Sequence, residues 1–506
     1  MVQIGEKLNS LSLKENYKIS QRYYSTIKEE SKLTLTQIKR MFINNNFKTW
    51  PENKTLYFIQ KDVLQKQMEL VSLADIYGLQ SEKVYKKQLL LVNSLFFRII
   101  AIDKLFNSVF YKTYLSYPKE EEKVKVELVE KLKIILKNPN LYISNPIKYL
   151  WIFNNNKQKL LNITTLYVIG LQHLINLVLE PLVEKTGELH SFGFRPNKSA
   201  KNALGYLNSN LLKQDSRWIL NTEIKGFFDK INQKWILNNL FLHPDLIKFI
   251  KSWFNSGRID KEVFFETEMG ISPGGVLSPT LVNFTLNGLE NLLMNSLIPL
   301  TNIKQQQLFN YSSQFTSNLV YIRYLDNLVI LIRSKYIFNI YVKPILNKFL
   351  ELRGLSLCQE KSKLFKLKEN SLSLDFLGYT FKSQEKCSNK KHIFYSAKSR
   401  GIALYPNKIK VLAFLDNIRN IFIKSQNLNA YTLMKKLNPF LIKWCNYYNL
   451  GNSFHSRNTV KNAIYHLIWK WAHNKHKKWG KKLIAKTYLK QSNSRLLNNL
   501  KWVFKN

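Results

Sequence analysis

Two short apolar runs on either side of a tight polar turn restrict the fold more than any other segment of this sequence. The runs are LVYIRY at residues 319–324 and LVILI at residues 328–332, and the turn between them contains Asp326 and Asn327. Runs rich in β-branched residues that meet at such a turn are typical of a β-hairpin. The carboxylate at the turn is either a solvated surface group, which is the commoner case, or one ligand of a metal site.

A second acid ends another apolar run upstream, in the segment WILNTEIKGFFDK at residues 218–230. Two-metal nucleotidyl transfer requires carboxylates from separate strands that converge on Mg²⁺ ions roughly 3.5–4 Å apart. Glu223 and Asp326 can supply such a pair, whereas taken alone each acid is more often an ordinary strand end.

A glycine pair lies between these two segments, in GISPGGVLSPTLVN at residues 270–283. Gly274 and Gly275 allow the backbone to approach a ligand or a template strand closely, because glycine has no Cβ. The alternative is a plain junction between a loop and the helix that begins at the Ser-Pro pair.

The charge of the chain requires a polyanionic partner. Its 506 residues include 77 Lys and Arg against 34 Asp and Glu, a formal net charge of +43, while 45% are hydrophobic and can form packed cores. Residues 382–506 alone carry 26 basic and two acidic residues, a net +24, with many Trp and Tyr among them. This combination predicts a nucleic-acid surface, and a solvated Lys-rich surface over an aromatic core is the alternative. The balance argues against an ordinary small-molecule enzyme.

The remaining composition excludes other classes. Three scattered Cys without a CxxC pair argue against a disulfide framework or a Cys-based zinc module. Two uncharged runs, residues 160–179 and 269–289, are long enough to span a membrane, but polar side chains interrupt the first, and Pro and Gly the second. We therefore expect buried segments and no membrane partner.

Patterning along the chain predicts an α+β fold. Residues 17–115 and those from about 405 onward are patterned as helices, and residues 166–183 form another helix. Residues 149–153 are strand-like, and residues 216–400 alternate short strands with helices.

The segments above, in this order, resemble the reverse transcriptase–maturases encoded by group II introns. Further blocks strengthen the resemblance: HSFGFRPNKSA at residues 190–200, EKS at 360–362, FLGY at 376–379, LNPFLIKWCNYY at 437–448, and residues 81–101, which resemble the N-terminal extension. Each block is modest evidence, but their joint order over most of the chain is specific.

The resemblance implies a right-hand polymerase-like fold with fingers, a palm built on an antiparallel sheet, and a helical thumb, also called the maturase or X domain. It predicts a helical N-terminal extension at residues 1–80, fingers at 81–205, a palm at 206–400 and a basic thumb at 401–506. It also assigns roles to residues. The polymerase site would comprise the metal-binding acids Glu223 and Asp326, the neighbouring Asn327, and the nucleotide-site residues Phe228, Gly274, Gly275 and Lys361. The RNA-binding residues would be Arg195, Lys198, Lys436, Lys443, Trp444, Tyr447, Tyr448, His473, Lys475, His476, Lys477 and Lys478.

The sequence departs from the family where catalysis is most demanding. Glu223 replaces the first catalytic Asp, Asn327 replaces the second Asp of the Tyr-x-Asp-Asp box, and Pro273 replaces a Gln near the incoming nucleotide. Phosphoryl transfer depends on metal positioning and charge stabilisation, so these changes are expected to lower the rate on the order of 10³-fold or more.

Two functions follow from this comparison. The first is a maturase that binds structured group II intron RNA and assists its folding and splicing, with reverse-transcriptase activity weak or lost. The alternative is an active RNA-directed DNA polymerase that uses Mg²⁺ at Glu223 and Asp326, with dNTPs as its small-molecule substrates. Mg²⁺ is expected only if polymerase activity remains, and the sequence leaves a homodimer open.

The location is predicted from composition and analogy. The first residues, MVQIGEKLNS, contain neither an apolar signal core nor an Arg-rich amphipathic presequence. The Asn, Lys and Ile content indicates an A+T-rich gene, and such maturases are often encoded within organelle introns. We expect a plastid (chloroplast) protein, with the mitochondrion as the alternative.

Overall fold

The structure is a computed structural model that describes residues 49–108, 111, 120–154, 157–213, 218–302, 319–367, 373–383, 402–484 and 487–488. These residues form two compact units. The first contains the described residues up to Ser199, together with Thr222–Val329 and Lys335–Ser362. The second contains Ala200–Asn221, Ile330–Ser334 and the described residues from Lys363 onward.

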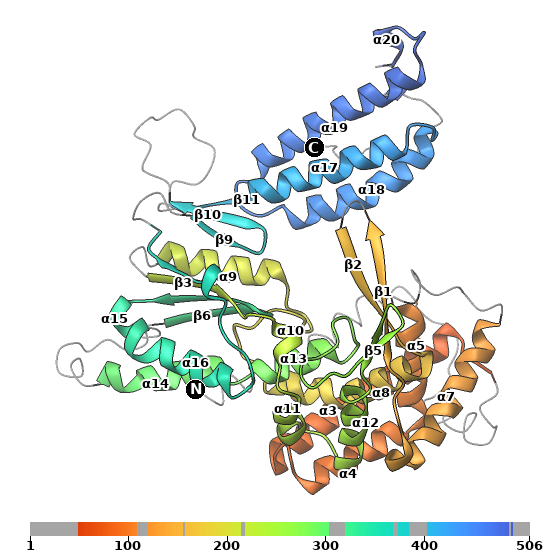
Figure 1. The fold of residues 1–506 in the computed structure, drawn as a ribbon, viewed down its shortest axis with the longest axis vertical. Helices are drawn as coiled ribbons and strands as arrows, with labels where there is room; N and C mark the ends of the chain where they lie inside the picture. The colour runs from red at the N-terminus through yellow and green to blue at the C-terminus, as the bar shows by residue number, and fades with distance from the viewer. Residues whose placement is uncertain are drawn as a thin grey trace. The chain divides into compact units, whose positions relative to one another are not determined.

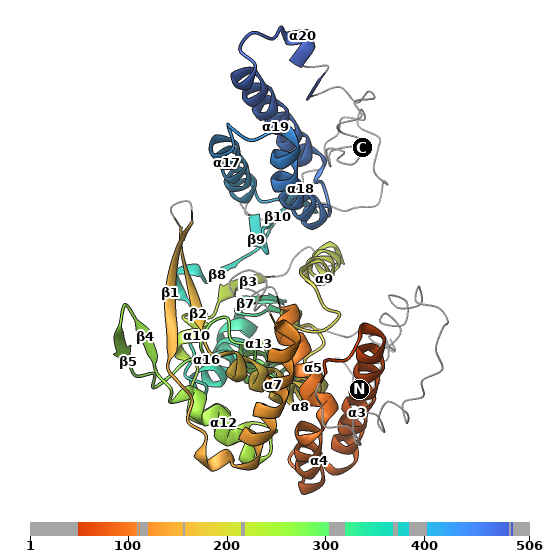
Figure 2. The same cartoon turned by 90° about the vertical axis from the view of Figure 1, so that its right-hand side faces the viewer.

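Helices dominate the first unit up to Ser199. They are α3 (Asn53–Tyr77), α4 (Glu82–Asn93), α5 (Leu95–Asn107), α7 (Glu121–Lys137) and α8 (Leu166–Lys185), with a short 3₁₀ turn at Pro139–Leu141. Helix α8 lies at the centre, and α3, α4, α5 and α7 all pack against it (Figures 1 and 2). A helix that is apolar on all sides must be buried on all sides, which explains why α8 has so few polar residues.

Helix α8 is also the one helix among the described residues that is long and apolar enough to span a membrane. Its most apolar window is 67% buried inside the structure. The predicted uncharged run at residues 160–179 therefore belongs largely to a core helix packed on its neighbours. The second run, residues 269–289, contains a loop and helix α13 (Ser278–Leu286).

Three sheets complete the described fold. Their strands are β1 (Ile147–Asn154), β2 (Lys157–Ile163), β3 (Trp218–Glu223), β4 (Arg258–Asp260), β5 (Val263–Phe265), β6 (Leu319–Tyr324), β7 (Asn327–Ile332), β8 (Lys363–Phe365), β9 (Ser373–Phe376), β10 (Tyr379–Ser383) and β11 (Ile402–Pro406). The strand orders are β2-β1-β4-β5, β6-β7-β3-β8 and β11-β10-β9.

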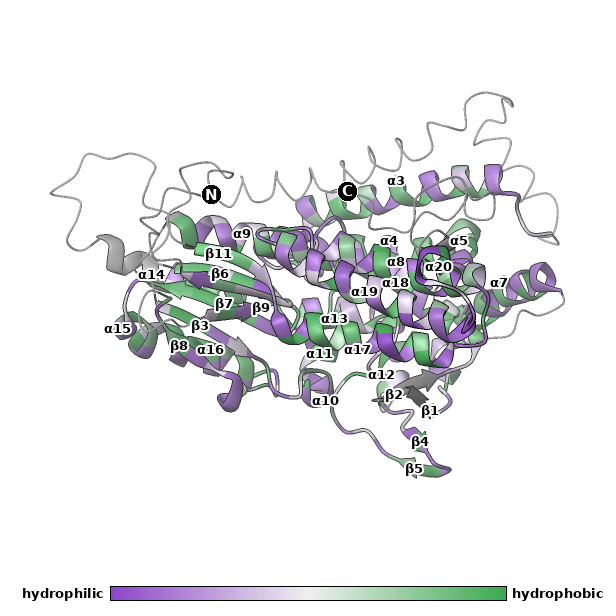
Figure 3. Ribbon diagram, turned by 90° about the horizontal axis from the view of Figure 1, so that it is seen from above, coloured by the Kyte–Doolittle hydropathy of each residue, from purple (hydrophilic) through white to green (hydrophobic). Residues whose placement is uncertain are grey.

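The predicted hairpin is confirmed as β6 and β7, which are joined by the two residues Leu325 and Asp326. Five of the six residues in each strand are buried, so both faces of the hairpin are covered. This burial explains the continuous apolar runs, and both strands are strongly hydrophobic in Figure 3. Strand β3 lies between β7 and β8, and its pairing with β8 is antiparallel.

The first unit contains further helices after Thr222. They are α10 (Phe227–Lys230), α11 (Gln233–Asn239), α12 (Pro244–Phe254), α13, α14 (Leu289–Asn302), α15 (Lys335–Ile337) and α16 (Lys343–Glu351), with a π-helical turn at Phe338–Val342 and a 3₁₀ turn at Gln359–Lys361.

The second unit contains the helices α9 (Ala200–Lys213), α17 (Lys408–Lys424), α18 (Ala430–Tyr447), α19 (Phe454–Lys475) and α20 (Lys481–Ile484). Helix α17 packs against both α18 and α19. The N-cap side chains Asn407 and Asn429 accept backbone N–H groups at the starts of α17 and α18. At the C-terminal end of α17, the Trp471 indole donates to the Ser425 carbonyl at 3.0 Å and joins α19 to the α17–α18 loop.

The α+β class is confirmed, as are the predicted strand at residues 149–153 and the helix at residues 166–183. The predicted division into four regions remains a prediction, since the structure clusters into two units whose boundaries cross it. Residues 1–48, most of the predicted N-terminal extension, lie outside the described residues.

Helix α8 gives a test of this core. Leu174 on α8 is fully buried, so Leu174→Ala should lower the free energy of unfolding by about 2–5 kcal/mol through lost burial and a cavity. Urea unfolding followed by circular dichroism measures this loss. The control is Ile134→Ala on α7, whose side chain is 66% exposed and whose effect should stay within about 0.5 kcal/mol. Equal losses for the two variants would contradict the proposed core position of α8.

Candidate active site and nucleic-acid surface

The turn that carries Asp326 is fixed by the loop at residues 190–200. The Phe192 N–H donates to the Arg323 carbonyl at 2.9 Å, and the Arg323 N–H donates to the His190 carbonyl at 3.0 Å. A Cβ on Gly193 would lie 2.7 Å from the backbone nitrogen of Leu325, so only glycine fits this close approach. Leu325 itself has φ +59°, an uncommon conformation for a branched side chain that its neighbours must hold in place.

The two predicted acids end neighbouring strands. The Ile224 N–H donates to the Asp326 carbonyl at 3.0 Å, which joins the end of β3 to the β6–β7 turn. Glu223 and Asp326 are therefore brought together from positions about a hundred residues apart in the sequence. Asn327 lies beside them, and its amide nitrogen donates to Asp326 Oδ1 at 3.0 Å.

A lysine joins this acidic pair. Lys361 Nζ lies 2.5 Å from Glu223 Oε2 and forms an ion pair with it. Backbone bonds set its position: the Cys358 N–H donates to the Glu223 carbonyl at 2.8 Å, and the Lys225 N–H donates to the Ser356 carbonyl at 2.8 Å. The hydroxyls of Thr222 and Ser362 are also 2.5 Å apart. The EKS block is thus tied to the end of β3 on both sides of Lys361.

The three charges affect one another. Burial raises the pKa of the Asp326 carboxyl, and the nearby Glu223 charge raises it further, while Lys361 opposes the rise. The pKa of Lys361 is raised by its hydrogen bond to Glu223 and by the charge of that carboxylate. The cluster of Glu223, Asp326 and Lys361 is therefore one electrostatic group, in which the ammonium stabilises two carboxylates that would otherwise repel.

Few side chains at this cluster can bind a metal ion. Among the described residues, no group of three or more His, Cys, Asp or Glu side chains could hold a metal ion. Asn327, where the family has a third acid, offers a neutral amide instead of a carboxylate. Two carboxylates with a lysine ammonium on one of them do not fit a two-Mg²⁺ centre, because the third acid is missing and the ammonium repels a cation.

The glycine loop at residues 270–275 lies against the turn that contains Phe228. The Ile271 N–H donates to the Phe228 carbonyl at 2.6 Å, and a Cβ on Gly270 would meet that carbonyl at 2.8 Å. Gly274 is exposed, and a Cβ added there would meet nothing within 4 Å. The Val276 N–H is bound by the Gln172 side chain of α8 at 3.3 Å. The backbone at Gly274 therefore has open space beside it. Phe228, whose carbonyl accepts from the loop at Ile271, is half-buried.

A buried charge network lies directly behind the turn. Arg323 is fully buried on β6 and pairs with the buried Glu188 at 3.5 Å. Asn283 and Asn287 each offer a side-chain oxygen to Arg323 at 3.4 Å. Glu188 also accepts the Glu290 N–H at 2.6 Å, so α13, α14, β6 and the 187–200 loop all meet at this network.

Arg195, which the sequence predicted to contact RNA, is a buried loop residue in the structure. It forms a two-pronged ion pair with Glu184 at 2.7 and 2.8 Å. It also donates to the Ser191 carbonyl at 3.0 Å and to the Glu188 carbonyl. Four of its five N–H donors therefore hold the loop together, and its contact with RNA stays a prediction.

Lys198 is only partly available. Its ammonium donates to the Leu189 carbonyl at 2.6 Å and the Glu188 carbonyl at 3.3 Å. Burial and the neighbouring Arg195 charge lower the pKa of Lys198 to about 8. The Lys198 ammonium therefore bonds mainly to its own loop, and only part of its hydrogen-bonding capacity is left for an RNA phosphate.

In the second unit, the predicted thumb aromatics also form core. Trp444 is 6% exposed and stacks on Phe414 with ring centroids 5.1 Å apart, and Tyr448 is 8% exposed and lies against Tyr379. The Tyr447 hydroxyl donates to the Leu377 carbonyl at 2.7 Å. Trp444 and Tyr448 join α18 to α17 and to the β9–β11 sheet as buried core rings, and their contact with RNA stays a prediction.

The exposed face of α18 supplies the surface that the aromatics do not. Lys436 and Lys443 are exposed, and seven residues, about two helical turns, separate them. Phe440 lies between them on the same face and is 53% exposed. Sequence reasoning missed Phe440, although its spacing of four residues from Lys436 and three from Lys443 was a readable signal. An aromatic ring between two lysines can stack a base while the lysines bind phosphates.

The predicted basic cluster at residues 473–478 divides in two. Lys477, Lys478 and His473 are exposed. Lys475 donates to the Leu428 carbonyl at 2.6 Å and closes the end of the helix bundle. The His476 ring stacks on Trp479 at 3.8 Å, and its Nε2 lies 2.7 Å from the Tyr488 hydroxyl.

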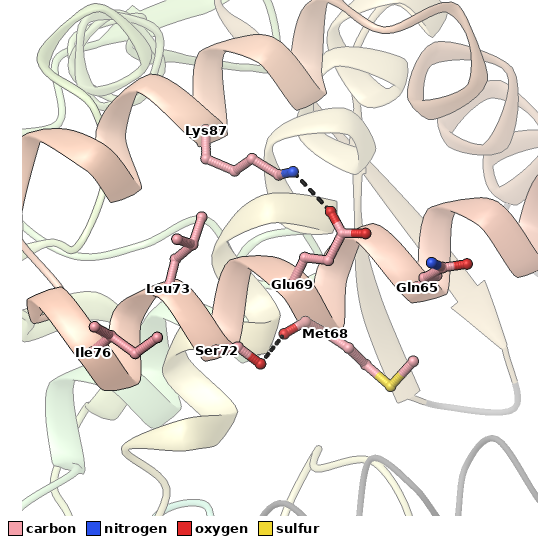
Figure 4. Close-up of a pocket in the computed structure, with 7 residues that line it drawn as sticks. All are labelled: Gln65, Met68, Glu69, Ser72, Leu73, Ile76 and Lys87. Carbon is pink, nitrogen blue, oxygen red and sulfur yellow. Dashed lines mark hydrogen bonds and ion pairs between the residues drawn. The ribbon is translucent and has the colours of Figure 1, made fainter.

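One shallow groove lies apart from these residues, on helices α3 and α4 (Figure 4). It is lined by Gln65, Met68, Glu69, Ser72, Leu73, Ile76 and Lys87. Its Lys87–Glu69 ion pair, at 2.8 Å, connects the two helices. The groove contains none of the predicted site residues, and its chemistry indicates helix packing.

A strand hairpin with an acid at its turn, a second acid from the adjacent strand and a glycine loop beside them define a protein of the polymerase-like class. Comparison with known protein families gives the same class. The reverse transcriptase (RNA-dependent DNA polymerase) family matches residues 153–381, and the group II intron maturase-specific domain family matches residues 411–489.

Individual relatives are more distant. The group II intron-encoded protein LtrA of Lactococcus lactis subsp. cremoris is 28% identical over 179 residues, which are 34% of this chain and 28% of the relative. Protein YkfC of Escherichia coli (strain K12) is 24% identical over 199 residues, 36% of this chain and 52% of the relative. Maturase-like protein 1 of Euglena gracilis is 23% identical over 386 residues, 73% of this chain and 72% of the relative. The two family matches, in this order, identify the chain as a member of the group II intron-encoded reverse transcriptase/maturase proteins.

The buried network behind the turn can be tested by substitution. Arg323→Met should lower the free energy of unfolding by about 3–5 kcal/mol, because it leaves the Glu188 carboxylate buried without its partner. The double variant Arg323→Met with Glu188→Leu removes both charges and should recover much of that loss. Chemical denaturation of the single and double variants measures the coupling, and additive losses would show that the two groups do not interact.

Proposed function

We propose that this protein is a maturase: it binds structured group II intron RNA and assists its folding and splicing, and its reverse-transcriptase activity is weak or lost. The observation that carries the proposal is the exposed Lys436–Phe440–Lys443 face, which lies within the segment that matches a maturase-specific domain. The surplus of 24 positive charges in residues 382–506 supports it. The intron supplies the splicing chemistry, and the protein stabilises its folded form through phosphate contacts and stacked unpaired bases.

In this proposal the parts of the chain take the roles of a right hand. Residues 81–205 act as fingers, residues 206–400 as the palm, and residues 401–506 as the basic thumb or X domain. The match of residues 153–381 to reverse transcriptases supports the polymerase-like framework. The gene location that we propose is a plastid genome, with a mitochondrial genome as the alternative. Sequencing the DNA on both sides of the reading frame tests the location and identifies the intron.

The alternative function is an active RNA-directed DNA polymerase that uses dNTPs and Mg²⁺. One observation favours it: the structure brings Glu223 and Asp326 to neighbouring strand ends, with space beside Gly274. The loss of the third acid at Asn327 and the Lys361–Glu223 ion pair both weigh against efficient catalysis.

The RNA surface yields a quantitative expectation. Changing Lys436, Lys443, Lys477 and Lys478 to Gln should weaken intron binding and lower the slope of log affinity against log salt by about 3. Splicing of the host intron at low Mg²⁺ should lose its acceleration in parallel. The charge-matched control neutralises four lysines of the first unit, Lys86 on α4 and Lys123, Lys133 and Lys137 on α7, of which the first three already pair with acids. Equal loss in the control, or equal acceleration of splicing by an unrelated basic protein, would remove the proposal.

Phe440→Ala tests whether stacking contributes. Because the ring is exposed, the variant should fold normally yet weaken binding on the order of 1–3 kcal/mol if an unpaired base stacks there. The salt slope should stay unchanged, since no charge is removed. Filter binding over a salt series measures both quantities, with Ile423→Ala on α17, 63% exposed, as the control for an exposed apolar side chain.

Primer extension on an RNA template separates the two functions. We expect little product from the natural protein. Glu223→Asp together with Asn327→Asp should raise the product, since this pair of changes restores the acids of the family. Processive synthesis by the natural protein that disappears on Asp326→Ala would establish the polymerase instead.

A further inference from the structure

The acidic cluster of the palm-like sheet has its own cation. We propose that Lys361 is a built-in counter-ion that takes the electrostatic place of a divalent metal ion at Glu223 and Asp326. The inference deepens the proposed loss of polymerase activity and rests on that part of the proposed function. The proposed pairing of Lys361 with the two acids is a property of the protein in the absence of RNA.

The geometry carries the first step. The ammonium of Lys361 reaches Glu223 at 2.5 Å, although the lysine side chain is 61% exposed and has water as an alternative partner. The backbone bonds from residues 356–358 to residues 223–225 place the lysine at the end of β3. The pair therefore results from the sheet itself, which brings two segments separated by 138 residues into register.

The donor count carries the second step. Mg²⁺ and Mn²⁺ require six oxygen ligands in an octahedron, of which the protein usually gives carboxylates and the rest are water. Here one oxygen of Glu223 accepts from Lys361, and one oxygen of Asp326 accepts from the Asn327 amide. A divalent ion would bind the second oxygens of two carboxylates instead of three, with the Lys361 ammonium close beside it.

Charge carries the third step. A lysine ammonium beside a carboxylate repels a divalent ion at the same position, while it removes the repulsion between the two acids that a metal ion would otherwise neutralise. The Lys361 ammonium thus stabilises the two carboxylates without a metal ion. The same side chain lowers the affinity of the cluster for divalent ions.

The test is divalent-ion binding by the RNA-free protein, with Mn²⁺ as the probe and electron paramagnetic resonance as the readout of free ion. The natural protein should bind Mn²⁺ weakly at this cluster. Lys361→Met should raise the affinity on the order of tenfold, because the competing charge is gone. Lys361→Arg keeps the charge and should behave like the natural protein. Circular dichroism confirms that each variant is folded.

Two further variants locate the effect. Lys225→Met removes the same charge two residues from Glu223, and Lys225 makes no ion pair in the part of the chain that the structure describes, so its gain should be much smaller. Adding Asp326→Asn to Lys361→Met should abolish the new binding. Tight Mn²⁺ binding by the natural protein, or equal gains for Lys361→Met and Lys225→Met, would overturn the proposal. This experiment measures neither splicing nor RNA binding. A result that contradicts the counter-ion proposal therefore leaves the maturase function standing, and a failed splicing assay leaves the Mn²⁺ result standing.

Discussion

The buried ion pair between Arg323 and Glu188 is the constraint on which the rest of the first unit depends. Two charges at 0–1% side-chain exposure are costly to bury, and they persist here because Asn283, Asn287 and the Glu290 N–H share their hydrogen bonds. Arg323 is also the residue whose backbone pairs with the 190–200 loop. The ion pair therefore fixes β6, α13 and the loop through Arg323 and α14 through Glu188, and the Asp326 turn follows directly from β6.

The order of the sequence motifs becomes comprehensible from this network. The 190–200 block supplies the glycine against the turn, the 270–283 block supplies Asn283, and the 319–332 block supplies Arg323 and the turn. Each block is weak evidence when read alone, because a glycine or an asparagine has many structural uses. In the fold they are one set of contacts, in which the Asn283 amide donates to the Gly193 carbonyl at 3.0 Å.

The sequence predicted the framework better than the roles of side chains. The hairpin and the α8 helix depend on apolar runs and turn residues, which are local signals, whereas the convergence of Glu223 with Asp326 was predicted from the needs of two-metal chemistry and the order of the motifs. The burial of Arg195, Trp444 and Tyr448 depends on partners far along the chain, such as Tyr379 for Tyr448, and composition cannot distinguish a buried cation or ring from an exposed one. Phe440 is different, because its spacing from Lys436 and Lys443 is a local signal of a shared helix face, and the structure shows that this face is exposed.

The buried and exposed parts of the turn have different tasks, and this separation explains how a polymerase-like framework can serve RNA binding. Arg323, Glu188 and Gly193 hold the backbone of the turn without using the carboxylates of Glu223 or Asp326. Replacing an acid with Asn327 at the surface removes a metal ligand but leaves these contacts intact. Stability and catalysis therefore depend on separate residues within the same hairpin. With Lys361 as the counter-ion of the remaining acids, the sheet does not need metal to balance its charge. The contacts that hold the reverse-transcriptase framework therefore persist whether or not the acidic site binds a metal ion.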